Sequence, residues 1–301
     1  MLCMQEMRTS HRRAGWLTPG GVHASLPPEA GTSPSRAPRA HSSLRGAATG
    51  PTRHARLRTM QGRLCRRGPF MLCGHVHALW RYPVKSMAAE PLERAEIGWH
   101  GISGDRRWAF VRAAQVRNGF PWLTIREKPT LWRYQPRLVD GARPDKTDVQ
   151  VRTPAGDELE VCDPALAAQL GAGVRAMKLD RGTFDTATLS LITRQTLAGL
   201  GGLVGRELAA PRFRPNILID AAGDFPEDAW VGRVLRIGSL RVRVDKRDQR
   251  CVLVNIDPVT CARDPAVLKT IGRAREACLG VYGSVVAPGA LAVGDPVMLD
   301  A

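Results

Sequence analysis

The sequence predicts a mainly β fold of the α+β class, built as a β-barrel or sandwich with a few short helices. Two observations indicate this class. From residue 76 onward, short runs rich in aromatic and β-branched residues alternate with turns rich in glycine and proline. Helical patterns are few and short, and they do not alternate regularly with strands, as a doubly wound sheet would require.

The predicted strands share apolar runs that end at turn residues. In the first half of the patterned region they lie at 75–82, 105–113 and 122–127, followed by a hairpin over 148–162. In the second half they lie at 188–193, 213–220 and 251–257, with a hairpin over 233–244 that turns at Gly238–Ser239, and with short strands over 280–299.

Three helices are predicted. The first begins at the N-cap Asp163 and Pro164 and ends near Gly171, because a capping carboxylate and a first-turn proline favour a helix start. The second follows the strand 188–193, over 194–205, and the third repeats the Asp-Pro start at Asp264–Pro265.

The formal net charge is +16 at pH 7, and most of the excess lies in residues 1–70, which hold twelve arginines and only two acidic residues. This segment has no periodic apolar face, so we expect it to be disordered. An organelle transit peptide is one alternative. A start codon assigned too far upstream, with translation beginning near Met60 or Met71, is the interpretation that we favour, because patterned sequence begins right after Met71.

The remaining chain has a small positive excess and no aromatic stacking motif, so nucleic-acid binding is not expected. The seven cysteines are scattered without a CxxC pair, and the sequence has no secretory apolar region and no 18-residue apolar run. We therefore expect a cytoplasmic protein without a membrane span, and a monomer.

Three clusters contain the groups that hold phosphorylated ligands: an ammonium, forked guanidiniums, a hydroxyl and a carboxamide. They are Lys85–Ser86, Asp105–Arg107, and Arg212 with Arg214 and Asn216. Arg214 and Asn216 are two residues apart and would share one face of a strand. Taken singly, each residue has a simpler interpretation, because an arginine at a strand end is usually a solvated charge and an asparagine after proline usually belongs to a turn.

Cys251 stands beside Lys246, Arg247 and Arg250. Neighbouring cations favour a thiolate, which is a soft metal ligand. The residues alone leave three alternatives open: a buried core thiol, a disulfide with Cys261, or a ligand. His75 and His77 could chelate a metal from one strand face, but no third ligand stands at a suitable spacing.

Seven motifs, in this order along the chain, together resemble one family. They are "LWRYPVKSM" (79–87), "GDRRWAFV" (104–111), "LTIREKP" (123–129), "RFRPNILID" (212–220), "DAWVGRVLRIG" (228–238), "RCVLVNIDPVT" (250–260) and "GVYGSVVAPGALAVGDPVML" (280–299). The sequence is similar to MOSC-domain proteins that carry an N-terminal MOSC β-barrel domain, a group that includes the mitochondrial amidoxime-reducing component and the C-terminal part of molybdenum cofactor sulfurase.

This resemblance implies an N-terminal MOSC β-barrel domain over 71–180 and a MOSC domain over 181–301. It also implies a molybdenum–molybdopterin cofactor, with Cys251 as the metal ligand and catalytic residue. The cofactor-binding residues would be Lys85, Ser86, Arg106, Thr188, Arg214 and Asn216. The family is associated more weakly with pyridoxal phosphate binding. Cys261 departs from the pattern, because the family usually has glycine there, and it would either perturb the turn or supply a second thiol.

Two functions are compatible with the resemblance. One is a molybdenum-dependent reductase that acts on small N-hydroxylated or related N- or S-oxide compounds. Since this chain has no iron–sulfur cysteine cluster, its electrons would come from a separate ferredoxin-like or cytochrome b5-like protein. The alternative is a carrier of the cofactor, or of sulfur as a Cys251 persulfide, without reductase turnover.

Overall fold

The computed structural model describes residues 70–112 and 121–300, which belong to one compact unit. The extension predicted over 1–70 lies outside these residues except for Phe70. The described part of the chain contains three α-helices and a closed seven-stranded β-barrel, so the predicted mainly β fold is confirmed. No helix within the described ranges is long and apolar enough to cross a membrane.

The barrel closes in the order β1, β11, β10, β14, β13, β12, β16 and back to β1. All neighbouring strands are antiparallel except β10 and β11. The strand bounds are Met71–Arg81 (β1), Leu189–Thr193 (β10), Ile217–Asp220 (β11), Val234–Ile237 (β12), Leu240–Gln249 (β13), Cys278–Ala287 (β14) and Pro296–Leu299 (β16). Alternating apolar side chains fill the interior; on β13, for example, Leu240, Val242 and Val244 are fully buried.

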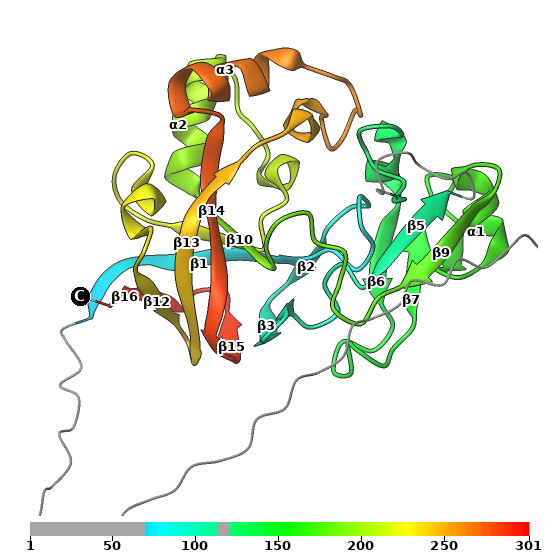
Figure 1. The fold of residues 1–301 in the computed structure, drawn as a ribbon, viewed down its shortest axis with the longest axis horizontal. Coiled ribbons are helices and arrows are strands. Elements are labelled where there is room, and N and C mark those ends of the chain that lie inside the picture. Colours follow the sequence, from blue (N-terminus) through cyan, green and yellow to red (C-terminus); the bar gives the residue numbers. More distant parts are fainter. Residues whose placement is uncertain (1–69, 113–120, 301) are drawn as a thin grey trace, which may run out of the picture. The chain divides into compact units, whose positions relative to one another are not determined.

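Smaller sheets flank the barrel. Their strands are Glu90–Leu92 (β2), which extends β1, then Arg94–Gly98 (β3), Gly101–Ile102 (β4) and Gly289–Ala292 (β15), the pair Trp108–Arg112 (β5) and Val174–Lys178 (β9), and Gln135–Leu138 (β6), Val149–Arg152 (β7) and Glu158–Glu160 (β8). Figure 1 shows β1 running from the barrel toward the region of β5, β6, β7 and β9. This second region has its own apolar cluster, which includes Val84, Met87, Phe110 and Trp132.

The predicted helix starts are confirmed. Asp163 caps α1 (Pro164–Leu170) and Asp264 caps α3 (Pro265–Arg275), each by accepting a hydrogen bond from a first-turn backbone N–H. Helix α2 (Arg194–Val204) begins after the cap Thr193. Helices α2 and α3 pack against each other over a third apolar cluster that includes Ile192 and Leu279 (Figure 1).

Two predicted strands are wrong. Residues 124–127 form a turn, in which the Thr124 carbonyl accepts hydrogen bonds from the backbone N–H groups of Glu127 and Lys128. The apolar run after Cys251 forms a 3₁₀ helix, Val252–Asn255, because apolar side chains of this run pack into two different clusters. Val254 packs with the helices and Ile256 with the second region. A periodic pattern cannot separate these cases in so short a run.

The barrel crosses the predicted domain boundary. Strand β1 belongs to the segment 71–180, yet it pairs with β11 and β16, which come from the segment 181–301. The division at 180/181 stays a prediction. The three remaining 3₁₀ helices named among the described residues are Pro129–Arg133 (η1), Ala210–Phe213 (η2) and Pro226–Trp230 (η3).

Candidate functional site

One cavity of about 110 Å³ gathers most of the predicted site residues. Its lining comes from Lys85, Ser86 and Arg106, from Phe184–Ala187 and Ser190, from Phe213, Arg214 and Asn216, from Asp248–Cys251, Leu253 and Val254, and from Tyr282. Six of the seven predicted residues therefore meet here, although they are far apart in the sequence. The exception is Thr188.

Three of these residues have left-handed backbone conformations. The φ angles are 68° at Ser86, 50° at Arg106 and 52° at Arg214. Non-glycine residues rarely adopt this region, and such strained positions concentrate at functional sites. Arg214 ends the helix η2 and precedes β11, so the expectation that it shares a strand face with Asn216 is wrong. The left-handed turn, and not strand alternation, brings both residues to the cavity.

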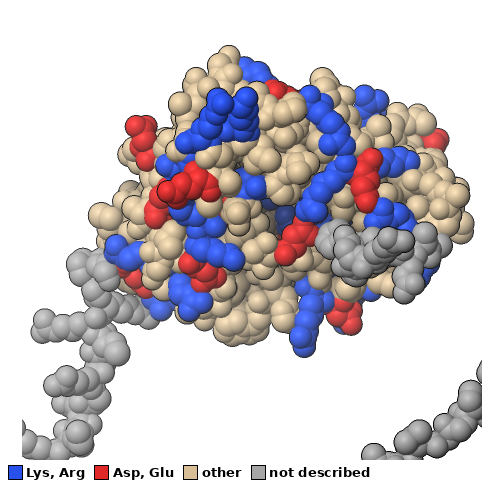
Figure 2. All heavy atoms as spheres, turned by 45° about the horizontal axis from the view of Figure 1, so that its top comes forward, with Lys and Arg blue, Asp and Glu red and all other residues tan. Residues whose placement is uncertain are grey.

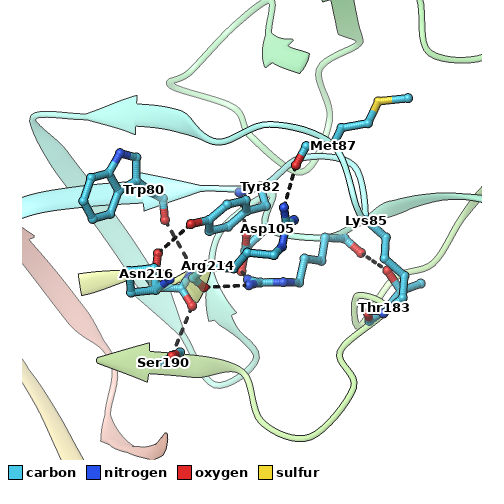
Figure 3. A network of polar contacts seen from close by, with 11 residues as sticks. Trp80, Tyr82, Lys85, Met87, Asp105, Thr183, Ser190, Arg214 and Asn216 are labelled. Atoms are coloured by element: carbon cyan, nitrogen blue, oxygen red, sulfur yellow. Dashed lines mark hydrogen bonds and ion pairs between the residues drawn. The ribbon is translucent and has the colours of Figure 1, made fainter. Parts of the chain in front are cut away.

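Arg214 is a buried cation with one unpaired end. Its Nη1 donates to the Met87 carbonyl at 2.7 Å (Figure 3). Its guanidinium stacks on the rings of Tyr82 and Trp132, at 4.2 and 5.0 Å from the ring centroids. Its Nη2 is buried without a hydrogen-bond partner among the described residues. Burial lowers the pKa of Arg214 to about 10, so the group stays charged at neutral pH.

Arg106 lies next to Arg214. Its guanidinium is paired with the buried carboxylate of Asp105 and lies 4.6 Å from the Tyr82 ring centroid. Its Nη2 also donates to the Arg214 carbonyl at 3.3 Å. Two guanidiniums thus share the faces of one aromatic ring, which fixes their orientation toward the cavity.

Asn216 is fully engaged by the protein. Its Nδ2 donates to the Trp80 carbonyl at 3.2 Å and to Asp105 at 3.1 Å, and its Oδ1 accepts from the Ser190 backbone N–H at 3.3 Å (Figure 3). The side chain is 1% exposed. Asn216 therefore holds strands and the Asp105 carboxylate in place, which makes it a positioning residue of the wall.

Lys85 lines the same cavity. Its Nζ donates to the Thr183 carbonyl at 2.7 Å (Figure 3). The same ammonium pairs with the Asp185 carboxylate. Burial lowers the pKa of Lys85, and the charge of Asp185 opposes that shift. Asp185 also accepts from Arg126 at 3.3 Å. Asp185 was not among the residues predicted from the sequence, although it lies only three residues before the predicted Thr188.

Cys251 is exposed and lines the cavity at the start of the 3₁₀ helix. The residue before it is firmly held, because Arg250 donates from Nε to the Leu279 carbonyl at 2.7 Å and from Nη1 to the Phe213 carbonyl at 2.8 Å. Cys251 and Cys261 are both free thiols. Of the three alternatives for Cys251, the core thiol and the disulfide are therefore wrong, and the ligand remains a prediction.

Cys261 occupies a left-handed position, with φ of 62°. Its backbone N–H donates to the Asp257 carbonyl at 3.0 Å, and its half-buried thiol packs against the apolar cluster of the second region. A glycine would adopt this conformation without strain. The turn therefore keeps a glycine-type backbone although it carries a cysteine.

A buried carboxylate, Asp248, was also missed. It is 1% exposed, accepts from Ser190 Oγ at 3.1 Å and pairs with Arg250 Nη2 at 2.9 Å. Burial raises its pKa, which Arg250 counteracts. Strict alternation along β13 would put Asp248 on the buried face with Val242 and Val244, but it would also bury Lys246, which is exposed after the bulge that follows Val244.

Thr188 and two arginines of the predicted clusters, Arg212 and Arg107, do not line the first cavity. Thr188 packs against the turn at Gly101, where a Cβ would lie 2.8 Å from the Thr188 carbonyl oxygen, and its neighbour Thr186 lines the cavity instead. Arg212 is buried and pairs with Asp257, and Arg107 pairs with Asp145. Within the described ranges, no group of three or more His, Cys, Asp or Glu residues could hold a metal, so His75 and His77 have no third ligand there.

Charges of both signs are interspersed on the face shown in Figure 2. This face is therefore not uniformly basic, and the cations of the site are those that line the cavity, among them Lys85, Arg106 and Arg214. Such an arrangement suits a compact anion with several acceptor oxygens.

Two family models match this chain. The MOSC domain matches residues 179–298, and the MOSC N-terminal beta barrel domain matches residues 73–186. Mitochondrial amidoxime-reducing component 1 of Homo sapiens is 25% identical, over 75% of this chain and 83% of that protein. Molybdenum cofactor sulfurase of Drosophila mojavensis is 28% identical over 67% of this chain, which spans 30% of the sulfurase. Among solved structures, the YuaD protein from Bacillus subtilis aligns with a TM-score of 0.45 and 12% identity, covering 77% of this chain and 98% of that one.

Proposed function

Because this chain belongs to the MOSC-domain family, with a MOSC N-terminal β-barrel domain before the MOSC domain, we propose that its cavity binds a molybdenum–molybdopterin cofactor and that it reduces N-hydroxylated or related N- and S-oxide compounds. The family predicted from the sequence is confirmed. The names of the amidoxime-reducing and cofactor-sulfurase relatives support the cofactor and the reaction.

The observation that carries the proposal is the unpaired Nη2 of Arg214. A buried cationic donor without a partner is costly, and a phosphate oxygen would satisfy it with a charge-assisted hydrogen bond. Lys85 and Arg106 line the same cavity and add positive charge. The residues present therefore fit a phosphorylated cofactor.

The exposed thiol of Cys251 fits the metal. A thiolate is the soft ligand that such metals take, and the hydrogen bonds of Arg250 fix the backbone that presents it. When bound, the cofactor supplies oxygen-atom and electron transfer at molybdenum. Arg106, Arg214 and Lys85 would hold the phosphate, while Asn216 and Asp105 keep those cations in position. The contribution of Ser86 stays a prediction.

The partners remain predictions. A reductase on this chain would take electrons from a separate ferredoxin-like or cytochrome b5-like protein. Cytoplasmic localisation and the monomeric state are likewise untested, and the named relatives include mitochondrial proteins. We propose no pyridoxal phosphate site.

The test is elemental analysis combined with turnover. Protein produced in a host that makes the cofactor should carry about one molybdenum per chain, and it should reduce an amidoxime or a hydroxylamine with an artificial electron donor. Loaded protein that turns over no compound of an amidoxime, hydroxylamine, N-oxide and S-oxide panel would contradict the reductase assignment.

The exposure of Cys251 also favours the second candidate, a carrier of the cofactor or of persulfide sulfur. A persulfide on an exposed Cys251 would transfer its outer sulfur to a thiolate of another protein and leave the Cys251 thiolate behind. This function predicts cyanolysable sulfur or easily lost cofactor in purified protein, with no reductase turnover. Cyanolysis and cofactor retention of wild-type and Cys251→Ala protein, together with the turnover assay, separate the two candidates.

A further inference from the structure

A second cavity adjoins the first. It has a volume of about 730 Å³, within the range of small-molecule sites, and it shares Thr186, Ala187 and Tyr282 with the first cavity. These three residues thus form a common wall. A ligand in the larger cavity would lie directly beside the proposed reaction site.

Trp99 is the main aromatic group of this second cavity. Trp99 is 64% exposed and lies in the turn between β3 and β4. The turn is held close to the common wall, because Gly101 has φ of 91° and packs against Thr188. An indole anchored beside a cavity offers a face on which a planar ring can stack.

The strand β13 supplies cations to the same cavity. Arg243 and Lys246 line it and are exposed. Asp245 lines the cavity as well, but its carboxylate is paired within the protein, since it accepts hydrogen bonds from Arg243 Nε at 2.7 Å and from Ser284 Oγ. Lys246 makes no ion pair with another described residue. A bulge in β13 between Val244 and Lys246 interrupts the regular pairing of this strand with β14.

We propose that the second cavity is a substrate subsite for planar aromatic compounds that carry an anionic substituent, a carboxylate or a phosphate. The ring stacks on Trp99, the anion lies near Lys246 and Arg243, and the polar group at the other end of the ring points past Tyr282 into the first cavity. This assignment rests on the proposed function for the group that reacts, but ring and anion recognition depend on the second cavity alone.

The experiment measures binding without turnover. Calorimetric titration of the full chain uses 4-carbamoylbenzoate and benzamide, which share a planar, uncharged carboxamide and differ in the carboxylate. The carboxylate compound should bind about fivefold more tightly, the upper range for an exposed ion pair. Trp99→Ala should weaken both ligands about tenfold through lost stacking, whereas Trp99→Phe should retain most of the affinity.

Lys246→Gln should remove the preference for the carboxylate compound, and Lys246→Arg should keep it. Lys146→Gln is the matched control, because Lys146 is also exposed but does not line this cavity. Equal affinities for the two ligands in the wild type, or unchanged binding in Trp99→Ala, would overturn the subsite. Because neither ligand is reduced, absence of molybdenum or of turnover would affect only the proposed function.

Discussion

Glu227 and Arg214 are both buried ionisable side chains, but only one of them has its polar atoms satisfied. Glu227 is fully buried and accepts hydrogen bonds from the hydroxyls of Thr193 and Thr196, each at 2.7 Å, and from the Thr193 backbone N–H at 3.3 Å. Arg214 uses Nη1 within the protein and leaves Nη2 unpaired at the cavity.

This difference distinguishes a structural residue, Glu227, from a candidate binding residue, Arg214. The Glu227 network ties η3 to the beginning of α2, and it leaves no donor for a ligand. Native proteins satisfy almost all buried polar groups, so an unpaired one beside a cavity indicates a missing partner. The same rule distinguishes Asn216, whose amide is fully used, from Arg214.

Glu227→Ala should have the largest effect on stability. It leaves the Thr193 and Thr196 donors unpaired, and since each buried unsatisfied donor costs about 1–3 kcal/mol, the free energy of unfolding should fall by about 2–4 kcal/mol. Denaturant unfolding measures this loss. Asp180→Ala, at a side chain that is 98% exposed, should change it little. Comparable losses of unfolding free energy in both variants would show that the hydrogen bonds of Glu227 do not stabilise the fold.

Arg214→Ala should act mainly on binding. Loss of a charge-assisted hydrogen bond should cost about 1.5–3 kcal/mol of cofactor affinity, roughly ten- to a hundredfold. Equilibrium dialysis with fluorescence of the oxidised pterin reports the retained cofactor. Arg214→Lys keeps the charge but loses the forked geometry, so it should recover only part of the affinity. Arg181→Ala is the exposed control, and wild-type retention in Arg214→Ala would show that Nη2 is not a binding group.

The thiols allow a third comparison. Cys73 donates to the Val297 carbonyl at 3.2 Å, and burial raises its pKa to about 11, whereas Cys251 is exposed. At pH 8 iodoacetamide should alkylate Cys251 at least about tenfold faster than Cys73, because the thiolate is the reactive form. Peptide mass spectrometry follows both sites.

The sign of the pH effect follows from the raised pKa of Cys73. Below about pH 9 the thiol is neutral in both the folded and unfolded chains, so it does not affect stability. Between pH 9 and 11 only the unfolded chain loses the proton, so the contribution of Cys73 to stability falls as the pH rises. Cys73→Ala should lessen this alkaline loss, and an unchanged pH profile would refute the assignment.

Cys261→Gly should have the smallest effect. Glycine relieves a left-handed backbone but loses the packing of a half-buried thiol and gains freedom in the unfolded chain, so stability should change by less than about 1 kcal/mol. Thermal unfolding measures the change. A loss of cofactor on this substitution would instead support a role for Cys261 as a second thiol.

Much of the fold could be predicted because local rules decided it. The Asp-Pro starts of α1 and α3 and the hairpin at Gly238–Ser239 depend on capping and turn chemistry that a few residues carry. The 3₁₀ helix after Cys251 depends on which cluster each apolar side chain meets, and a short run does not encode that.

The sequence predicted most residues of the site, but it did not predict their backbone conformations or their hydrogen bonds. Motif positions identified six residues of the cavity wall. Contacts between distant segments decide the left-handed turns at Ser86, Arg106 and Arg214. They also decide that the Asn216 amide hydrogen-bonds within the protein. Thr188 shows the limit most clearly, because a shift of two residues decides which threonine enters the cavity.

In the proposed function, Cys251 holds a metal whose phosphorylated cofactor is bound by the buried cations. The most direct measurement is the molybdenum content of Cys251→Ala and Cys261→Ala proteins, purified side by side from a cofactor-producing host. We expect near-zero molybdenum in Cys251→Ala, with the unfolding temperature of cofactor-free wild-type protein, and wild-type molybdenum content in Cys261→Ala. Full molybdenum content in Cys251→Ala would contradict this assignment.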